Sequence, residues 1–435
     1  MRSISWRTVV RIIGVFAILV LPQVFAAVAV ADPTEKICRK DSPDPDPADR
    51  INSAPCGTYG EFISRVADTG EDIQIRYMVH KPKNKSKAIV VLIAGGLLGT
   101  GIAGNPATGQ VFTAGENFLV RSAQLFAEDG YTALTIHRPV KLTSPTPTAE
   151  FPTTGPGQAQ WDHYRVSSKH AFDIVRALAI VNTGNLPVFL AGTSRGAISV
   201  VANSMLGNGI LVSSPVANLT GVLPPDWPGC PPAMTCGLYV GHPWPSLQPG
   251  FVAVPTHVMA HQQDACSGTA PASALALHNA FLAAGVDSRF DTVDGGFAAP
   301  GEPACEALHF HGFFGVENRA VKFHTKRLDE ILKDLEKQFK GNTKPMTLPG
   351  AVGVATAYTM DLATLASDPG DTLTYSLPYP RSNRASPGAP ANLSLVGSLV
   401  VYTPPGPGPM TDGFTYLVSD GKGGISASYV IVTVP

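Results

Sequence analysis

The sequence predicts a chain of two folded parts, a mostly parallel sheet flanked by helices of the α/β class and then a small all-β sandwich. Between residues 57 and 341, short apolar runs such as 88–94 alternate with segments of helical periodicity. Such alternation builds a parallel sheet with helices on both faces. After Lys344 the composition changes: residues 345–435 are rich in Thr, Ser, Val, Gly and Pro in short alternating runs. This pattern is typical of a β-sandwich.

The first part opens with a hairpin, expected over 61–67 and 72–80 with a Gly-containing turn between. Further strands are expected at 88–94, 131–137, 187–191, 209–213, 256–260 and 289–293, and helices at 117–129, 162–181, 195–206, 270–284 and 316–340. The last helix ends at Gly341, a residue type that commonly terminates helices.

Segment 215–255 interrupts the alternation. It contains ten prolines and two tryptophans, Trp227 and Trp244. A segment of this composition cannot be regular helix or strand, so we expect it to lie over the sheet as a lid or cap. The alternative is a surface insertion without function. An aromatic cap would give a binding pocket an apolar wall, which makes the two tryptophans candidate substrate contacts.

Residues 1–31 have the pattern of a cleaved signal peptide. Three arginines precede an apolar stretch over 12–30, and Ala29-Val30-Ala31 is a small-x-small cleavage signal. An uncleaved membrane anchor is the competing interpretation. The sequence therefore predicts a secreted or periplasmic protein, cleaved after Ala31. Residues 32–56, rich in Pro and Asp, are expected to form an extended arm.

Six cysteines follow the predicted cleavage site. An even number in an exported chain indicates disulfides. The pairing that closes local loops is Cys38–Cys56, Cys230–Cys236 and Cys266–Cys305; the alternative is scattered buried thiols. No CxxC spacing is present, so no metal site is predicted.

Charge and composition limit the classes of partner. The formal net charge is −1, charged residues make up 15% of the chain and hydrophobic residues 44%. These values favour packed globular domains over disorder. Without a basic patch, a nucleic-acid partner has no electrostatic support.

The segment 192–196, Gly-Thr-Ser-Arg-Gly, lies between a predicted strand and a predicted apolar helix. This is the setting of a nucleophile elbow, in which a serine occupies a strained strand-to-helix turn and the helix N-terminus favours developing negative charge. The motif predicts that Ser194 is the nucleophile of a serine hydrolase with an α/β-hydrolase fold.

In this fold the catalytic acid follows a later strand and the histidine comes last. Asp264 follows the predicted strand 256–260, at the sheet edge where catalytic groups gather. His311 lies between the last strand and the last helix and precedes a glycine. Ser194, Asp264 and His311 are thus in the required chain order. The rivals are Asp287, Asp291 and Asp294 for the acid and His309 for the base, while His257 and His261 are pocket or loop candidates.

Such a triad works without a cofactor, and none is predicted. His311 would take the proton of Ser194 while Asp264 orients the imidazole. The oxyanion hole is expected to combine the backbone N–H of Arg195 with that of Gly96 or Leu97, between which the sequence does not choose. The side chain of Arg195 is expected to be an ion-pair partner.

The first part resembles a group of exported bacterial α/β-hydrolases through segments 115–122, 165–174, 192–196, 264–266 and 311–313. The resemblance spans most of residues 60–340 and implies a Ser-Asp-His hydrolase without supplying a substrate. Asn117, Arg121 and Arg165 fall in the matching segments and are candidate substrate contacts. The sequence at 94–98, Ala-Gly-Gly-Leu-Leu, departs from the His-Gly-Gly-Gly form of many esterases, which leaves the oxyanion geometry open.

In the second part, segments 368–375 and 412–421 resemble cadherin-like and immunoglobulin-like repeats of bacterial surface and secreted proteins. The resemblance implies a domain that contacts a polymer or a cell surface, or that only spaces the enzyme. Calcium binding at Asp368 and Asp371 is an alternative to turn capping by these aspartates.

The function expected is therefore a secreted serine hydrolase that cleaves a small or polymeric carboxylic ester through an acyl-enzyme. An amidase, peptidase or polyester depolymerase could use the same triad, because the triad sets acyl transfer and not the acyl group. An adhesion or binding protein with an inactive hydrolase domain is the alternative from a different class.

Overall fold

The computed structural model describes residues 57–67, 69–112, 116–143, 146–153, 157–216, 252–338, 340, 342–354, 356–385 and 391–435. Several predictions fall outside these residues: the signal peptide, the arm, most of the predicted cap with Trp227 and Trp244, and the pairs Cys38–Cys56 and Cys230–Cys236.

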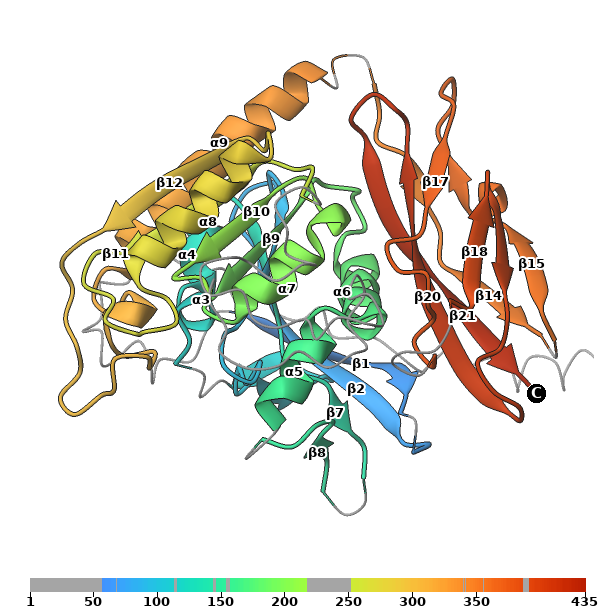
Figure 1. The fold of residues 1–435 in the computed structure, drawn as a ribbon, viewed down its shortest axis with the longest axis horizontal. Coiled ribbons are helices and arrows are strands. Elements are labelled where there is room, and N and C mark those ends of the chain that lie inside the picture. The colour runs from blue at the N-terminus through green and yellow to red at the C-terminus, as the bar shows by residue number, and fades with distance from the viewer. Residues whose placement is uncertain are drawn as a thin grey trace, which may run out of the picture.

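One large sheet organises the first part (Figure 1). Its main strands are β1 (Thr58–Val66), β2 (Asp72–His80), β3 (Ile89–Ile93), β6 (Thr132–Ile136), β9 (Val188–Thr193), β10 (Ile210–Ser213), β11 (Thr256–His261) and β12 (Ser288–Val293). They lie in the order β1-β2-β6-β3-β9-β10-β11-β12, with β2 antiparallel to both neighbours and all strands from β6 to β12 parallel. This order and direction define the α/β-hydrolase fold, so the predicted fold class is confirmed.

Four short strands accompany the main sheet. β7 (Val140–Lys141) and β8 (Thr148–Ala149) extend it beyond β2, and β4 (Ala103–Asn105) pairs with β5 (Gln110–Phe112).

Helices cover both faces of the sheet. On one side lie α6 (Ser168–Val181), α7 (Gly196–Ala202) and α8 (Pro271–Ala283), and on the other α3 (Phe118–Arg121), α4 (Ala123–Glu128) and α9 (Glu317–Gln338). The residues of β3 alternate between the two resulting cores, Val91 facing the first and Val90 and Leu92 the second. This explains why the strand is a continuous apolar run.

Three helices predicted as single elements are interrupted. Segment 162–181 divides into α5 (Gly157–Arg165) and α6, because the Ser167 side chain accepts a hydrogen bond from the His170 N–H and starts a new helix. Segment 117–129 divides at Ser122, and segment 195–206 divides at Asn203 into α7 and a 3-10 turn, η1 (Ser204–Leu206). Apolar periodicity alone does not reveal such breaks.

The second part contains two facing sheets and a short strand pair. One sheet has the strand order β14 (Gly350–Gly353), β21 (Ile425–Val434), β20 (Met410–Ser419), β17 (Thr374–Ser376). The other has the order β15 (Tyr358–Asp361), β19 (Leu399–Tyr402), β18 (Leu393–Val396). The short pair consists of β13 (Met346–Thr347) and β16 (Ala366–Ser367). The predicted all-β part is confirmed, and its core includes Val400, Tyr416 and Val430.

The two parts are in contact along α6, which packs on β20 and β21 (Figure 1). The ring of Phe172 lies 5.5 Å from that of Tyr429, and the Arg176 guanidinium lies over both. A Cβ on Gly413 would lie 2.6 Å from the Phe172 ring, so the contact requires glycine there. The sandwich is therefore seated on the hydrolase domain.

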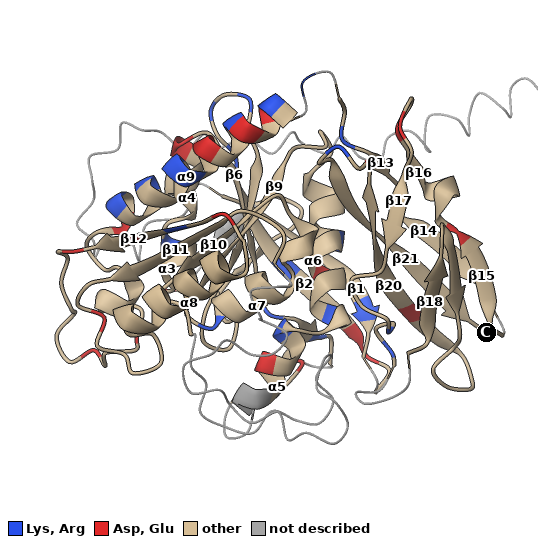
Figure 2. Cartoon of the chain, turned by 45° about the horizontal axis from the view of Figure 1, so that its top comes forward, with Lys and Arg blue, Asp and Glu red and all other residues tan. Residues whose placement is uncertain are grey.

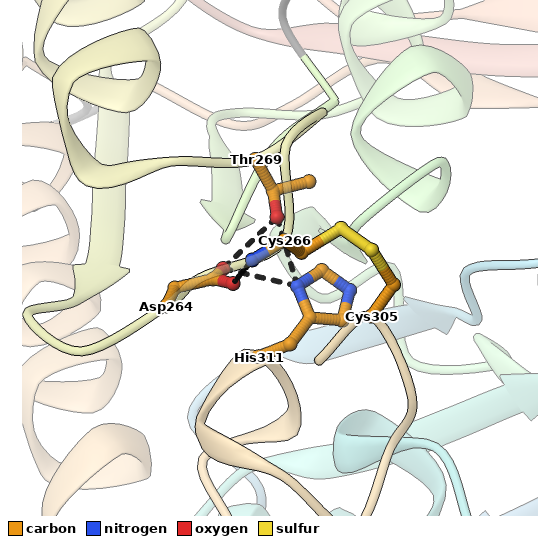
Figure 3. The surroundings of a disulfide bond; sticks show 5 residues. All are labelled: Asp264, Cys266, Thr269, Cys305 and His311. Atoms are coloured by element: carbon orange, nitrogen blue, oxygen red, sulfur yellow. Dashed lines mark hydrogen bonds and ion pairs between the residues drawn. A yellow bond between two sulfur atoms is a disulfide. The ribbon is translucent and has the colours of Figure 1, made fainter. Parts of the chain in front are cut away.

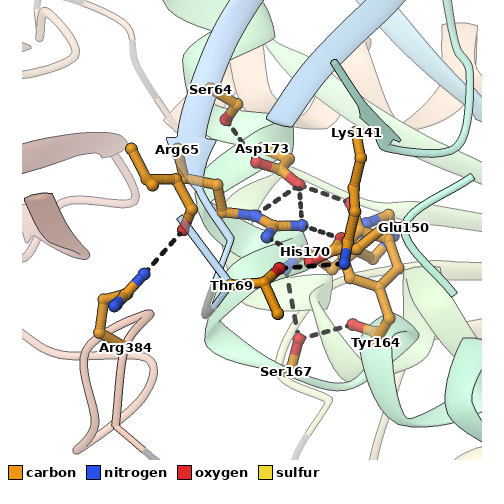
Figure 4. Close-up of polar contacts among 11 residues, drawn as sticks. Ser64, Arg65, Thr69, Lys141, Glu150, Tyr164, Ser167, His170, Asp173 and Arg384 are labelled. Atoms are coloured by element: carbon orange, nitrogen blue, oxygen red, sulfur yellow. Dashed lines mark hydrogen bonds and ion pairs between the residues drawn. The ribbon is translucent and has the colours of Figure 1, made fainter. Parts of the chain in front are cut away.

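A buried polar cluster joins β1 to α6 (Figure 4). Arg65 of β1 forms ion pairs with Glu150 and Asp173, and Tyr164 donates to Asp173 at 2.7 Å. Arg384 of the second part donates to the carbonyl of Ala67 at the end of β1. The charges in the cluster are paired, as buried charges must be.

Charged residues are frequent along α9, where Lys, Arg, Asp and Glu follow one another (Figure 2), and most of them are exposed. Among the residues described, there is no helix whose length and hydropathy would suffice for a membrane span.

Candidate active site

Ser194 lies at the turn between β9 and α7. Its backbone has a φ of 57°, in the left-handed region that a residue with a side chain rarely adopts. Its N–H donates to the Ser213 carbonyl at 3.0 Å, and its carbonyl accepts from Ala197 at 3.1 Å and Val216 at 3.2 Å. The structure thus has a strained strand-to-helix turn at Ser194, held by backbone hydrogen bonds on both sides.

The glycines that flank Ser194 permit backbones to touch. A Cβ on Gly196 would lie 2.3 Å from the Ile93 carbonyl oxygen, and a Cβ on Gly192 would lie 2.2 Å from the Gly196 carbonyl oxygen. Neither clash can be relieved by rotating a side chain, because both partners are backbone atoms. A larger residue would separate α7 from β3 and alter the turn.

Asp264 and His311 are brought together from distant loops (Figure 3). Asp264 follows β11, and His311 lies in η4 (Phe310–Gly312). Nδ1 of His311 is 3.0 Å from Oδ2 of Asp264, and Thr269 Oγ1 is 2.9 Å from each of these atoms. The Cys266 N–H donates to Oδ1 of Asp264 at 3.0 Å. A neutral imidazole with its proton on Nδ1 satisfies these contacts and leaves Nε2 free to act as a base.

The loops that carry this pair are joined covalently. The Cys266–Cys305 disulfide, predicted from loop closure, is present, with the two Cα atoms 4.7 Å apart (Figure 3). It connects the loop that follows Asp264 with the loop that leads to His311. Both side chains of the pair are at most 5% exposed, so the interaction is shielded from water.

Arg121 supports the turn that carries His311. Its guanidinium donates to the carbonyls of Gly312 at 2.8 Å and Ala307 at 3.2 Å, and pairs with Glu317 at 2.8 Å. Its side chain is 4% exposed. Arg121 therefore fixes the end of η4, a contribution that its position in the sequence did not indicate.

The loop after β3 lies directly against Ser194. A Cβ on Gly95 would be 2.8 Å from Cβ and 3.4 Å from Oγ of Ser194. Gly96 has a φ of 51°, and the Leu98 N–H donates to the Gly95 carbonyl at 3.0 Å. This hydrogen bond closes a turn over residues 95–98, and the two predicted oxyanion donors, Gly96 and Leu97, lie within that turn.

Backbone strain is concentrated around this region. Five non-glycine residues in the described part of the chain have positive φ, and all but Asn185 border the site: Leu98 in the loop after β3, Ser194, Ser214 after β10 and Phe313 after His311. Conformations of this kind persist where the surrounding structure enforces them, and they cluster at functional sites.

Ser194 and the Asp264–His311 pair lie at one edge of the sheet. β9 and β11 run parallel on either side of β10, so their carboxyl ends lie together. Within the described part of the chain, no hydrogen bond joins Ser194 Oγ to the imidazole. Nucleophile–base hydrogen bonds are often long or poorly aligned in sites without substrate.

The rival acids have partners of their own. Ion pairs join Asp287 to Arg327, Asp291 to His257 and Arg289, and Asp294 to Arg319. None of these contacts involves His311, so Asp264 is the acid that the structure places on it.

The other histidines near the site are held in place. His261 lies 2.8 Å from the Gly295 carbonyl oxygen and accepts from the Gln263 N–H at 3.1 Å. His257 contacts His324 at 2.9 Å. Burial lowers the pKa of both His257 and His261, which favours neutral rings. His309 directly precedes η4, with its ring against Phe310.

The predicted substrate contacts within the described residues have structural partners. The Asn117 side chain caps α3 by accepting from the Leu119 N–H at 3.1 Å. Arg165 has no exposed surface, and its guanidinium is bonded to Ser199 and to backbone carbonyls. The Arg195 side chain pairs with Asp162, as an ion-pair role predicts.

In the part of the chain that the structure describes, two groups of side chains have the composition of a metal site. In the first, Cys266 is oxidised in the disulfide, and Asp264 and His311 bind each other. The second contains Asp368, Asp371 and Asp420. Lys422 Nζ pairs with Asp371, and Asp420 accepts hydrogen bonds from Asn342 and from the backbone of Lys422 and Gly424. These contacts are those of turn-capping aspartates.

Comparison with known proteins identifies a family for the second part of the chain. The bacterial Ig domain family matches residues 342–433. Among solved structures, the thermophilic carboxylesterase EstE1 from a metagenomic library is 14% identical, with 66% of this chain and 92% of that chain covered and a TM-score of 0.36. An esterase of Pyrobaculum calidifontis is 14% identical, with coverages of 68% and 96% and a TM-score of 0.38. An acylaminoacyl peptidase of Pyrococcus horikoshii is 10% identical, with coverages of 64% and 42% and a TM-score of 0.37. No curated protein matches the chain.

At such TM-scores the assignment of the fold depends on the strand order and on the turn at Ser194, not on these likenesses. The chain has the α/β-hydrolase fold and carries a C-terminal bacterial Ig-like domain.

Proposed function

We propose that the protein is a secreted serine hydrolase that cleaves a carboxylic ester through an acyl-enzyme. The observation that carries the proposal is the strained turn at Ser194, together with a buried Asp264–His311 pair at the same edge of the sheet. A half-buried serine on a strained turn and a histidine oriented by a carboxylate are what nucleophilic acyl transfer requires.

In the proposed reaction, Nε2 of His311 removes the hydroxyl proton of Ser194 as Oγ attacks the ester carbonyl carbon. The carbonyl π electrons move to oxygen, and this oxyanion accepts hydrogen bonds from the backbone N–H of Arg195 and from Gly96 or Leu97. When the tetrahedral species collapses, the C–O bond to the alcohol breaks and His311 protonates the departing oxygen. Water then repeats the sequence on the acyl-enzyme and releases the carboxylic acid.

The compartment is part of the proposal. The Cys266–Cys305 disulfide supports an oxidising environment, and the N-terminal pattern supports export. The choice of an ester over an amide is supported by the composition of segment 215–255, which predicts an apolar pocket wall.

A panel of chromogenic esters and amides tests the proposal. The wild type is expected to hydrolyse at least one ester faster than the matched amide, while Ser194→Ala and His311→Ala retain less than about one thousandth of its kcat. His309→Asn is the matched control, since His309 lies two positions away and is not bonded to Asp264, and it should remain active. Preferential turnover of amides would replace the ester by an amide. A wild type that is inactive on the whole panel would favour a binding role.

A further inference from the structure

Helix α5 approaches the loop after β3 with a buried guanidinium. Nη2 of Arg165 donates to three consecutive carbonyl oxygens, those of Ala94 at 3.1 Å, Gly95 at 3.2 Å and Gly96 at 2.9 Å. Nη1 donates to Ser199 Oγ on α7 at 2.9 Å. The side chain of Arg165 has no exposed surface, so these hydrogen bonds are made in the protein interior and not at its surface.

Because peptide units are planar, these contacts constrain the orientation of the N–H groups predicted to bind the oxyanion. In a planar trans peptide, the C=O of one residue and the N–H of the next point in opposite directions. Holding the carbonyls of Gly95 and Gly96 on one side therefore turns the N–H groups of Gly96 and Leu97 to the other side. These are the two candidate donors of the loop, and Gly95 packs against Ser194.

The charge of Arg165 acts in the same direction. Burial lowers its pKa to about 10, with Asp162 opposing this effect, so the guanidinium stays protonated at neutral pH. A cation bonded to the carbonyl end of a peptide polarises its N–H and strengthens it as a donor. In a buried site this contribution is weakly screened.

The second donor is linked to the same helix. Asp162, one turn before Arg165 on α5, forms an ion pair with the side chain of Arg195. The backbone N–H of Arg195 is the other proposed oxyanion donor. Asp162 and Arg165 thus connect α5 to both halves of the proposed oxyanion hole.

From this arrangement we infer that Arg165, with Asp162, is a positioning residue of the active site, which aims the backbone N–H groups that bind the oxyanion. This inference rests on the proposed hydrolase function. It also replaces substrate contact as the role of Arg165, because a guanidinium without exposed surface cannot reach a substrate.

The test compares Arg165→Lys with Arg65→Lys in the full-length protein. Both substitutions keep the charge and remove a buried guanidinium, but Arg65 pairs with Glu150 and Asp173 away from the loop after β3. Arg165→Lys should lower kcat on a soluble ester by about 10- to 100-fold with little change in KM, since the oxyanion forms only in the transition state. The Ki of a trifluoromethyl ketone, which forms a tetrahedral oxyanion on the serine, should rise by the factor by which kcat/KM falls.

Arg65→Lys should leave both constants within about twofold of the wild type when it is folded. If Arg165→Lys does not fold, Ser199→Ala, which removes one anchor of the guanidinium, should lower kcat by about three- to tenfold in parallel with ketone binding. The inference is overturned if the folded variant keeps the wild-type kcat, if KM alone rises, or if Arg65→Lys loses kcat equally. A wild type without esterase activity or Ser194 labelling would instead refute the proposed function, and this inference with it.

Discussion

Thr269 provides a sharp test of the way the Asp264–His311 pair is held. Its hydroxyl is buried, donates to Oδ2 of Asp264 at 2.9 Å and lies 2.9 Å from Nδ1 of His311. Thr269→Val keeps the shape of the side chain and removes the hydroxyl. A hydrogen bond to a charged group contributes about 1.5 to 3 kcal/mol, and 1.36 kcal/mol is a tenfold change in rate. We therefore expect kcat to fall by about 10- to 100-fold.

The assay is steady-state hydrolysis of the best chromogenic ester, with melting temperatures measured alongside. Thr269→Ser keeps the hydroxyl and should retain most of the wild-type kcat, which separates the hydrogen bond from the volume of the side chain. KM should change little, because Thr269 acts through His311 and not on the substrate. A Thr269→Val protein that is folded and as fast as the wild type would show that the hydroxyl does not help to orient the imidazole.

Three further predictions concern the disulfide, the Ig-like domain and pH. Reducing the Cys266–Cys305 bridge should lower ester turnover before the domain unfolds. The bridge spans 39 residues, and closing a loop of this length contributes about 4 kcal/mol to the free energy of unfolding. Simultaneous loss of activity and near-UV circular dichroism would contradict this prediction. Deleting residues 345–435 should lower the melting temperature and the turnover of a soluble ester, because the deletion exposes Phe172 of α6 to water. Unchanged values would mean that the Ig-like domain is only a spacer. Between pH 7 and 4, the unfolding free energy of the wild type should fall by about 3 kcal/mol more than that of His137→Asn.

The sign of the pH effect follows from the environment of His137. Burial and the charges of Arg138 and Arg76 lower its pKa from 6.5 to about 3, and its Nδ1 accepts from the Thr100 N–H at 3.2 Å. Below about pH 6.5 the imidazole of His137 therefore binds a proton in the unfolded chain but not in the folded protein. The free energy of unfolding falls as the pH drops. Parallel pH profiles for the two proteins, measured by chemical denaturation, would contradict this account.

Much of the fold and of the candidate site could be predicted because the signals are local. The run at 88–94 shows a strand buried on both faces, and the glycines around Ser194 show where backbones must touch. Chain order brought Asp264 and His311 into consideration, and loop closure gave the Cys266–Cys305 pair. Each of these features depends on residues within one segment or on the known order of such segments.

The remaining features depend on contacts between segments that are far apart in the chain. Nothing local marks Thr269 as a partner of His311, 42 positions later. The sequence marks Arg165 only as a candidate substrate contact near the start of a predicted helix, and the fold alone places its guanidinium against the carbonyls of 94–96. The seat of the sandwich on α6 likewise requires the three-dimensional structure, because the Phe172–Tyr429 contact spans both domains.

The most direct test of the central claim is covalent labelling of the native protein with a fluorophosphonate, followed by peptide mapping. The proposed triad predicts a single phosphonylated residue, Ser194, with labelling abolished in Ser194→Ala and strongly slowed in His311→Ala. Labelling at a different serine, or none in a folded wild type, would contradict the assignment of Ser194 as an activated nucleophile.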